Sequence, residues 1–320
     1  MAKRTIWSDV ERFDAPGIHD VHIETALTNI SIAYRNDGFI ATEVFPVIKV
    51  NKQSDKYFKF EKTAWFRNEA GVRSPGSRAP RIDYFLTAEQ YTCVEFAAAK
   101  GVPDEIVANA DSPLTPKREA SEFVTDKILL KLEKDAADLV FTGANWTNTG
   151  APAGGVWSGD ASDPINDVVG PSNVRETVRK AIGRYPNVCI LGAAVWAALQ
   201  RHPDILDRVK YTQTGVVSEQ LVAQLFGVEK LLVGRAIIDS AKEGAAASLG
   251  DVWGSSAFFG WVPRTPGLLT PAAGYTFTWK DRQINEYYEE QEHQSVIEAL
   301  MNFDVKITSA DSGYLLTSVV

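Results

Sequence analysis

A histidine followed closely by two carboxylates is the pattern in this sequence that comes nearest to acid-base chemistry. His202 precedes Asp204 and Asp207, and a general base oriented by a carboxylate is the pair that such catalysis requires. His202 also stands directly before Pro203, which interrupts the helical pattern around it. We therefore interpret His202 as a structural residue at a helix break.

Two further groups have residue types that bind metal ions. His19 and His22 are close together with Asp14 and Asp20 nearby, a spacing that would bring two imidazoles to one face of a helix. The segment lacks a convincing helical pattern and has no second group of ligands, so we interpret the pair as solvated or as part of an interface. A run of carboxylates beside His293 is typical of a solvated face, with divalent-ion binding as the weaker alternative. The run comprises Glu286, Glu289, Glu290 and Glu292.

Motifs of nucleotide and hydrolase chemistry are absent from the sequence. It contains no GxxxxGK(S/T) phosphate loop and no GxSxG nucleophile elbow, and its glycines between residues 150 and 159 lack the strand-then-helix context of a dinucleotide fingerprint. We expect no catalytic residue, no cofactor and no bound metal.

Positive charge and aromatic rings gather between residues 65 and 81. Such a group can bind nucleic acid, but planar guanidinium groups are also enriched at protein interfaces, where they pair with carboxylates. An acidic protein offers those carboxylates on its neighbour, so we favour a contact between subunits. The candidate contact residues, with two aromatic residues of the N-terminal segment added, are Trp65, Phe66, Arg67, Arg73, Arg78, Arg81, Trp7 and Phe13.

Composition indicates a globular protein with a substantial core. The 320 residues are 45% hydrophobic and 23% charged, and a chain of this length buries about three quarters of its unfolded surface. The 33 lysines and arginines against 41 aspartates and glutamates give a net charge of −8. Because tight duplex binding depends on clustered positive charge that releases counterions, the chain is a poor candidate for gripping DNA.

Cysteine usage and hydropathy favour a reducing compartment. Cys93 and Cys189 lie in apolar, strand-like runs without CxxC or Cys-His spacing, so we predict two buried, reduced side chains. The N-terminal residues lack the apolar core of a signal peptide, and the longest apolar run, 189–199, is too short to cross a bilayer. We expect no membrane span.

The apolar periodicity around His202 predicts a small α/β domain. A buried strand over 187–191 leads into a helix that runs to the His202-Pro203 break, and helical spacing resumes after the proline. Ser218 is a suitable N-cap for the next helix and Gly227 a suitable left-handed C-terminal residue. The helix before the domain and the strands at its end are predicted over 173–183, 231–233 and 236–238.

Outside that domain the sequence predicts a long hairpin and a long helix. Alternating side chains over 47–62 and 81–94 indicate two strands, and the glycine, proline and serine residues of 71–80 indicate the loop between them. An isolated two-stranded ribbon is marginal in water, so it needs partners along its edges. Thr115 and Pro116 open a helix that keeps an apolar stripe to about residue 142. Later strands are predicted over 257–262, 275–280, 295–308 and 314–317.

Several of these segments resemble one known family. Residues 187–199 consist of an asparagine, a hydrophobic strand that ends at a glycine, and a helical segment that ends in Trp-Ala-Ala-Leu. Residues 202–212 are His-Pro-Asp-Ile-Leu-Asp-Arg-Val-Lys-Tyr-Thr. The segments that follow are Leu-Phe-Gly-Val-Glu at 225–229, Val-Gly-Arg-Ala at 233–236, Gly-Tyr-Thr-Phe-Thr-Trp-Lys at 274–280 and Ala-Asp-Ser-Gly-Tyr-Leu-Leu at 310–316. In this order, from about Phe45 onward, the sequence resembles the major capsid proteins of tailed phages, which have the Hong Kong 97-type fold.

The resemblance implies an α+β fold in four parts. An N-terminal arm would cover 1–45, and an extended β-hairpin loop that lies on the adjacent subunit would cover 46–95. A peripheral domain would cover 96–165 and 251–320, with the helix of about 116–142 as its spine. An axial α/β domain would cover 166–250.

The function that the resemblance implies is structural. Copies of the chain would assemble as hexamers and pentamers into the icosahedral shell of a phage head, which encloses double-stranded DNA without sequence-specific binding. The expected location is the virion, after assembly in the host cytoplasm, with scaffold, portal and decoration proteins as further partners. Because the arm begins at Met1 without a long helical extension, we expect any scaffold to be a separate protein.

Two alternatives stay open at this point. An encapsulin has the same fold and forms a compartment filled with cargo protein, so the contents of the purified particle would separate the two. A soluble α/β enzyme is the remoter alternative, and it would form a small oligomer with a ligand in a polar pocket.

Overall fold

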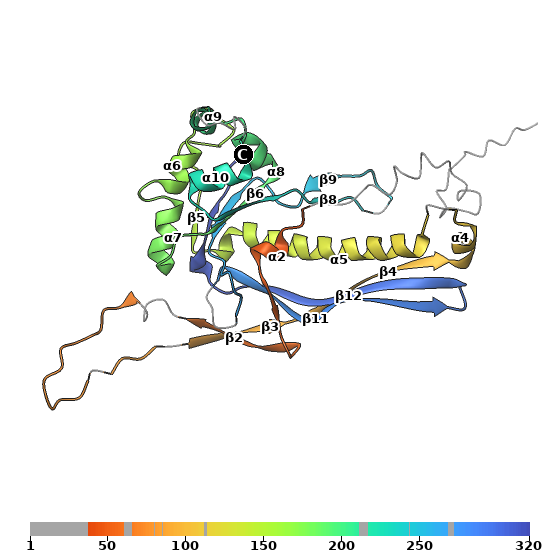
Figure 1. Ribbon diagram of the computed structural model, residues 1–320, viewed down its shortest axis with the longest axis horizontal. Helices are drawn as coiled ribbons and strands as arrows, with labels where there is room; N and C mark the ends of the chain where they lie inside the picture. The colour runs from red at the N-terminus through yellow and green to blue at the C-terminus, as the bar shows by residue number, and fades with distance from the viewer. Residues whose placement is uncertain are drawn as a thin grey trace, which may run out of the picture. The chain divides into compact units, whose positions relative to one another are not determined.

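Helices and strands follow one another along the chain (Figure 1). By their internal contacts the residues group into two units. The computed structural model describes residues 38–60, 66–79, 81–84, 86–111, 114–210, 217–242, 244–267 and 272–320. Among these, unit 1 consists of 98–111, 114–125 and 284–299, and unit 2 consists of the others. The four-part division predicted from the sequence stays a prediction.

A five-stranded sheet forms the centre of unit 2. Its order is β5-β13-β10-β6-β7. β6 is parallel to β7, β10 is antiparallel to both β6 and β13, and β13 is parallel to β5. The strands are β5 (Asn148–Gly150), β6 (Val188–Gly192), β7 (Lys230–Gly234), β10 (Ala257–Gly260) and β13 (Gly313–Leu316). The buried strand predicted over 187–191 is confirmed as β6.

Side chains of this sheet alternate between two cores. Cys189 and Leu191 of β6 belong to one core, and Val188 and Ile190 belong to the other, as the two-residue period of a strand requires. Helices therefore cover both faces of the sheet (Figure 1). A strand that is buried on both faces appears in the sequence as a continuous apolar run, which is why β6 was easy to predict.

The helices of the first core are α6 (Pro164–Val169), α7 (Val174–Ile182), α8 (Ala193–Leu199), α9 (Pro203–Val209) and α10 (Glu219–Phe226). Among them, α7 and α10 end at the glycines that the sequence predicts, whereas α6 was not predicted. Ser218 Oγ accepts a hydrogen bond from the backbone N–H of Leu221 at 3.4 Å, and Gly227 after the same helix has a φ of 64°. Gly183, which follows the helix of residues 174–182, has a φ of 72°.

The long predicted helix is confirmed as α5 (Pro116–Phe141), which has 26 residues. In unit 2 it contributes Leu132, Ala136, Ala137 and Val140 to the second core of the sheet. Phe123 has an apolar side chain at the spacing of this stripe, but it is half exposed, with the Lys100 ammonium 5.6 Å from the centre of its ring.

The described end of the predicted arm differs from an extended segment. Residues 38–45 contain helix α2 (Ala41–Val44), and Phe45 is fully buried in the second core. The apolar side chains of this stretch therefore find their partners on the body of their own chain. Residues 1–37 lie outside the described residues.

The predicted hairpin is confirmed over a shorter length than its boundaries. β2 (Ser54–Phe60) pairs antiparallel with β3 (Leu86–Thr92), from Ser54 opposite Thr92 to Phe60 opposite Leu86. β1 (Val47–Lys49), predicted as part of the same strand, instead pairs in parallel with β11. Alternation alone cannot distinguish the two arrangements, because a strand has the same two-residue period with either partner.

A second sheet has the order β1-β11-β12-β4. Its long strands are β4 (Val94–Pro103), β11 (Gly274–Glu289) and β12 (Gln294–Ile307). In unit 2 a third core lies at this sheet, where the rings of Tyr91 and Phe277 stack with centroids 4.7 Å apart. β11 extends nine residues beyond the predicted strand. The sequence did not predict this extension, because the later side chains are exposed and show no apolar alternation.

The remaining short elements are α4 (Asp104–Asn109), η1 (Gly143–Asn145), β8 (Ile237–Asp239), β9 (Leu249–Asp251) and η2 (Ala310–Ser312).

Unit 1 is held by contacts between α4, the start of α5 and the β11–β12 turn. The backbone N–H of Asp104 donates to the carbonyl of His293 at 3.0 Å, and the Tyr288 hydroxyl donates to the Asp104 carboxylate at 2.6 Å. Lys117 of α5 forms an ion pair with Glu286 at 2.8 Å. These contacts fix the turn that carries the acidic run of the sequence.

Candidate functional site

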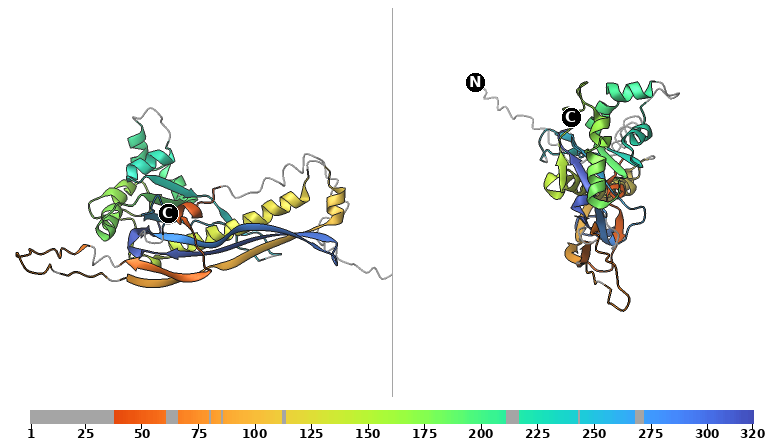
Figure 2. Two further views of the ribbon diagram at one scale, coloured as in Figure 1. Left: turned by 60° about the horizontal axis from the view of Figure 1, so that its bottom comes forward. Right: turned by 90° about the vertical axis from the view of Figure 1, so that its left-hand side faces the viewer.

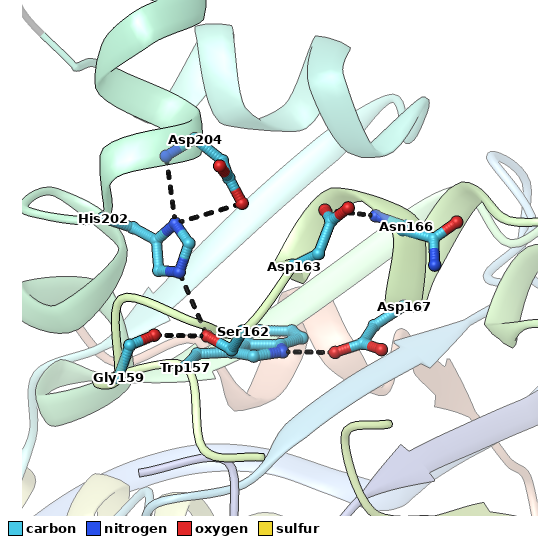
Figure 3. Close-up of polar contacts among 8 residues, drawn as sticks. All are labelled: Trp157, Gly159, Ser162, Asp163, Asn166, Asp167, His202 and Asp204. Carbon is cyan, nitrogen blue, oxygen red and sulfur yellow. Dashed lines mark hydrogen bonds and ion pairs between the residues drawn. The ribbon is translucent and has the colours of Figure 1, made fainter. Parts of the chain in front are cut away.

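His202 lies in a buried cluster of polar side chains beside Ser162 (Figure 3). Its Nε2 is 3.0 Å from Ser162 Oγ, and that hydroxyl donates its one hydrogen to the carbonyl of Gly159 at 2.7 Å. We therefore assign the ring proton to Nε2, which donates to Oγ. A histidine acting as a general base toward serine needs the opposite arrangement, with Nε2 as the acceptor.

The other ring nitrogen of His202 is occupied as well. Nδ1 accepts a hydrogen bond from the backbone N–H of Asp204 at 3.3 Å and so caps the first turn of α9. The Asp204 carboxylate lies 3.8 Å from Nδ1, whereas Asp207 is exposed on the same helix. His202 itself is 2% exposed. Both nitrogens are used inside the protein and no substrate can reach them, so the structural interpretation of His202 is confirmed.

A second buried contact in this cluster was missed in the sequence (Figure 3). The indole Nε1 of Trp157, which is fully buried, donates to the Asp167 carboxylate at 2.9 Å, and the same carboxylate accepts from the backbone N–H of Ala153 at 3.1 Å. Asp163 caps α6 by accepting from the N–H of Asn166 at 2.9 Å. The Asp163-Pro164 pair was a readable N-cap signal. These contacts all lie within residues 153–167 and fix the conformation of that segment.

Glu133 is the other buried carboxylate that sequence reasoning missed. It lies on α5 with no exposed surface, among apolar neighbours. Its oxygens accept from the backbone N–H groups of Ile40 at 2.9 Å and Ala41 at 2.8 Å, and from the indole Nε1 of Trp253 at 2.6 Å. Burial raises the pKa of Glu133, although the three donors act in the opposite direction. Glu133 thereby fixes the point at which the N-terminal segment joins α5.

The metal-binding alternatives gain no support in the described residues. His19 and His22 lie outside them. The acidic run is a solvated turn in which Gln294 bridges Glu289 and Glu292, while Glu286 pairs with Lys117. Across the part of the chain that the structure describes, no three histidine, cysteine or acidic side chains converge as metal ligands.

Most of the predicted contact residues lie in one exposed loop, residues 66–84, which we call the arginine loop (Figure 2). Phe66 is 60% exposed, although its ring lies beside Gly183. Arg67 pairs with Glu69 at 2.9 Å and Arg73 donates to the carbonyl of Ser77 at 2.7 Å. Arg78 and Arg81 are also exposed. Trp7, Phe13 and Trp65 are outside the described residues.

The two thiols are as predicted. Cys93 and Cys189 are both free and buried, and burial raises the pKa of Cys93 to about 11 and that of Cys189 well above its ordinary value. Among the described helices, none is both long and apolar enough to span a bilayer.

Comparison with known proteins gives two curated relatives. The chain is 26% identical to the major capsid protein of Burkholderia phage BcepMu, over 93% of this chain and 96% of the relative. It is 30% identical to the major capsid protein of Pseudomonas phage JBD67, over 81% of this chain and 84% of the relative. No protein-family model matches the sequence.

Solved structures give the same fold. A phage-related protein from Bordetella bronchiseptica RB50 superposes with a TM-score of 0.71 at 24% identity, over 93% of this chain and 97% of that one. The capsid of cyanophage P-SCSP1u gives a TM-score of 0.61 at 10% identity, over 95% and 94%. The SrpI encapsulin of Synechococcus elongatus gives 0.54 at 9% identity, over 92% and 95%. The Hong Kong 97-type α+β fold predicted from the sequence is confirmed.

Proposed function

The chain belongs to the major capsid proteins of phages, and from this membership we propose that its copies assemble as hexamers and pentamers into an icosahedral phage head. Proteins of this family are structural and not enzymes. Each subunit presents one surface to the next around a ring, and small changes at the same contacts close the ring at six or at five.

The observation that carries the proposal is the extended hairpin. β2 and β3 form a two-stranded sheet of their own, and the arginine loop beyond it exposes apolar side chains together with its arginines. Phe66, Val72 and Ile82 are 60%, 103% and 65% exposed. Exposed apolar groups beside arginine are typical of protein interfaces. The arginine loop at the end of this hairpin lies on the adjacent subunit in the assembled shell, whereas β1 and the buried side chains of β2 and β3 pack on their own chain. Many such contacts between subunits add together.

The assembled head encloses double-stranded DNA without gripping it. The net charge of −8 supports this part of the proposal, because a wall with little positive charge exchanges few counterions with the duplex. Purified subunit should show no duplex binding at micromolar concentration and physiological salt. The protein is assembled in the host cytoplasm, where a scaffold protein is a further partner, and it remains in the virion with portal and decoration proteins.

Electron microscopy of the expressed chain tests assembly directly. The wild-type chain, alone or with a co-expressed scaffold, is expected to form closed shells. A variant with residues 62–84 replaced by a short glycine-serine linker keeps β2, β3 and the buried Tyr57 and Tyr91. It is expected to give a folded subunit, by circular dichroism, that forms no shells. Shells of normal size from this variant would show that the loop at the end of the hairpin is not needed for assembly, which would contradict the proposal.

The contents of the particle separate the phage head from an encapsulin-like compartment. Both curated relatives are capsid proteins, whereas the likeness to an encapsulin, at 9% identity, concerns the fold alone. Nuclease-protected DNA in particles from phage-producing cells is the expected result. A cargo protein in place of DNA would favour the compartment.

A further inference from the structure

The buried ring of His202 can form both of its hydrogen bonds only while it is neutral. The Ser162 hydroxyl uses its hydrogen for the carbonyl of Gly159 at 2.7 Å, so it accepts from the ring Nε2–H at 3.0 Å. Nδ1 carries no hydrogen in this form and accepts from the backbone N–H of Asp204 at 3.3 Å. One ring nitrogen is a donor and the other is an acceptor, which is the pattern of a neutral imidazole.

A proton added to Nδ1 reverses the role of that nitrogen. Both nitrogens of a charged imidazole are donors, so Nδ1–H would face the N–H of Asp204 and the hydrogen bond between them would be lost. The carboxylate of Asp204 lies 3.8 Å from Nδ1 and its side chain is 45% exposed, so a short movement brings it within hydrogen-bond distance of the charged ring. Asp204 therefore has a partner for each form of the ring: its backbone N–H for the neutral form and its carboxylate for the charged form.

This exchange of partners alters the first turn of α9. Pro203 has no N–H to satisfy, and the N–H of Asp204 is the donor that the ring caps. When the ring is charged, this N–H loses its acceptor. Ile205 and Val209 are buried in the first core and hold the rest of the helix. The change is therefore confined to the N-terminal turn of α9.

The other charged side chains on the elements around the ring have partners of their own or are exposed. Those with hydrogen-bond partners are Asp163, Asp167 and Arg201, and the exposed ones are Asp160, Asp207 and Arg208 (Figure 3). Among the described residues, the Asp204 carboxylate is therefore the group that is placed to pair with a charged His202.

We propose that His202 and Asp204 form a pH-sensitive switch at the start of α9. With a neutral ring, Nδ1 caps the first turn of the helix. With a charged ring, Nδ1 donates to the Asp204 carboxylate and the first turn opens, while Nε2 keeps its hydrogen bond to Ser162. Histidine ordinarily changes its charge between pH 5 and pH 8, so we expect the switch to act in this range. The switch is a property of one subunit and goes beyond the proposed assembly.

NMR spectroscopy of the full-length, unassembled subunit with labelled histidines tests the switch. The chain has four histidines, and His202→Asn assigns the signals of the buried ring by their loss. Nε2 alone is expected to carry a hydrogen at pH 7.5, and both nitrogens at pH 5. Exchange of the Asp204 amide hydrogen, corrected for its intrinsic pH dependence, is expected to be about tenfold faster at pH 5, because one hydrogen bond is lost. The N–H of Leu221, which Ser218 caps in α10, is the internal control and should show no such change.

Two variants distinguish the switch from a general effect of acid. Asparagine is a good N-cap and has both an acceptor and a donor, but it cannot take up a proton, so amide exchange in His202→Asn is expected to be the same at both pH values. Asp204→Ala keeps the backbone N–H but removes the acceptor for the charged ring, so protonation of His202 is expected to require a pH about one unit lower. Asp207→Ala, on the exposed side of the same helix, is the matched control and should leave the titration unchanged.

Three results would overturn the proposal. They are a ring that stays neutral at pH 5, an acid response of the Asp204 amide that persists in His202→Asn, and a titration that Asp204→Ala does not move. If circular dichroism shows that His202→Asn does not fold, the wild-type titration and Asp204→Ala still decide the matter. Because every measurement uses the unassembled subunit, the outcome does not depend on whether shells form.

Discussion

The carboxylate of Glu133, on the long helix α5, accepts a hydrogen bond of 2.6 Å from the indole nitrogen of Trp253. The same carboxylate accepts from the backbone N–H groups of Ile40 and Ala41. Three segments that are far apart in the sequence therefore meet at one buried anion. Such a group stabilises the structure only while all of its donors are satisfied.

Glu133→Gln is expected to lower the free energy of unfolding. The amide presents one oxygen and an NH2 group where three donors need acceptors, so at least one buried N–H loses its partner, at a cost of about 1–3 kcal/mol. Glu133→Ala removes all acceptors and should cost more. Chemical denaturation of both variants checks this order. Glu122, on the same helix and more exposed, provides a matched Glu→Gln control with an expected change below about 0.5 kcal/mol.

The stabilisation by Glu133 should depend on pH with a defined sign. Because the pKa of Glu133 is higher in the folded protein, the folded state holds its proton more tightly than the unfolded state. The contribution of Glu133 to stability is then fully present below the unfolded pKa and declines as the pH rises through the folded pKa. The difference in unfolding free energy between wild type and Glu133→Gln should therefore be larger at pH 4 than at pH 8. A difference that grows with pH would contradict the direction of the shift.

Gly192→Ala is expected to be among the most damaging single changes in unit 2. A Cβ at this position would lie 1.9 Å from the carbonyl oxygen of Gly254 and 2.6 Å from that of Trp253. Both obstacles are backbone atoms, so relief requires movement of the chain, with a cost of about 1–3 kcal/mol or more. Gly254→Ala is the matched control, since a Cβ there meets nothing within 4 Å. Thermal unfolding of the two variants should separate them clearly.

His202→Ala is expected to reduce stability. The change removes the acceptor that caps α9 and the partner of Ser162, and loss of a cap together with a buried hydrogen bond costs about 1–3 kcal/mol. Asp207→Ala, on the exposed side of the same helix, should be nearly neutral. Denaturant midpoints test both. Equal stability of the two variants would show that the buried hydrogen bonds of His202 contribute nothing.

The thiols of Cys93 and Cys189 should resist modification in the folded subunit. Both are buried, and a shift of the Cys93 pKa from 9.0 to about 11 lowers its thiolate fraction about a hundredfold. A chromogenic disulfide reagent at pH 8 is expected to label neither cysteine before unfolding and both after it. Rapid labelling of native protein would show that the cores around them open.

Secondary structure in the apolar parts of the chain could be predicted, because the buried side chains of a helix or strand recur in the sequence at a regular spacing. α5, β6 and α10 each combine such a period with a cap or breaker, and their ends are confirmed within a few residues. The outer half of β11 could not be predicted, because the side chains of residues 281–288 are all exposed. A strand that is solvated on both faces has no hydrophobic alternation.

Contacts between segments that are distant in the sequence also could not be predicted. That Val47 lies opposite Thr276, or that Glu133 meets Ile40 and Trp253, depends on tertiary contacts that no local pattern encodes. The arginine loop was visible as a charged, glycine-rich segment, because turn residues and unpaired charge are local properties.

The position of β13 has a consequence for biosynthesis. Residues 313–316 form an inner strand of the five-stranded sheet, between β5 and β10, and β1, near the other end of the sequence, pairs with β11. The ribosome must therefore have made almost the whole polypeptide before either sheet can close. Nascent chains that end before residue 313 lack β13, the strand that joins β5 to β10.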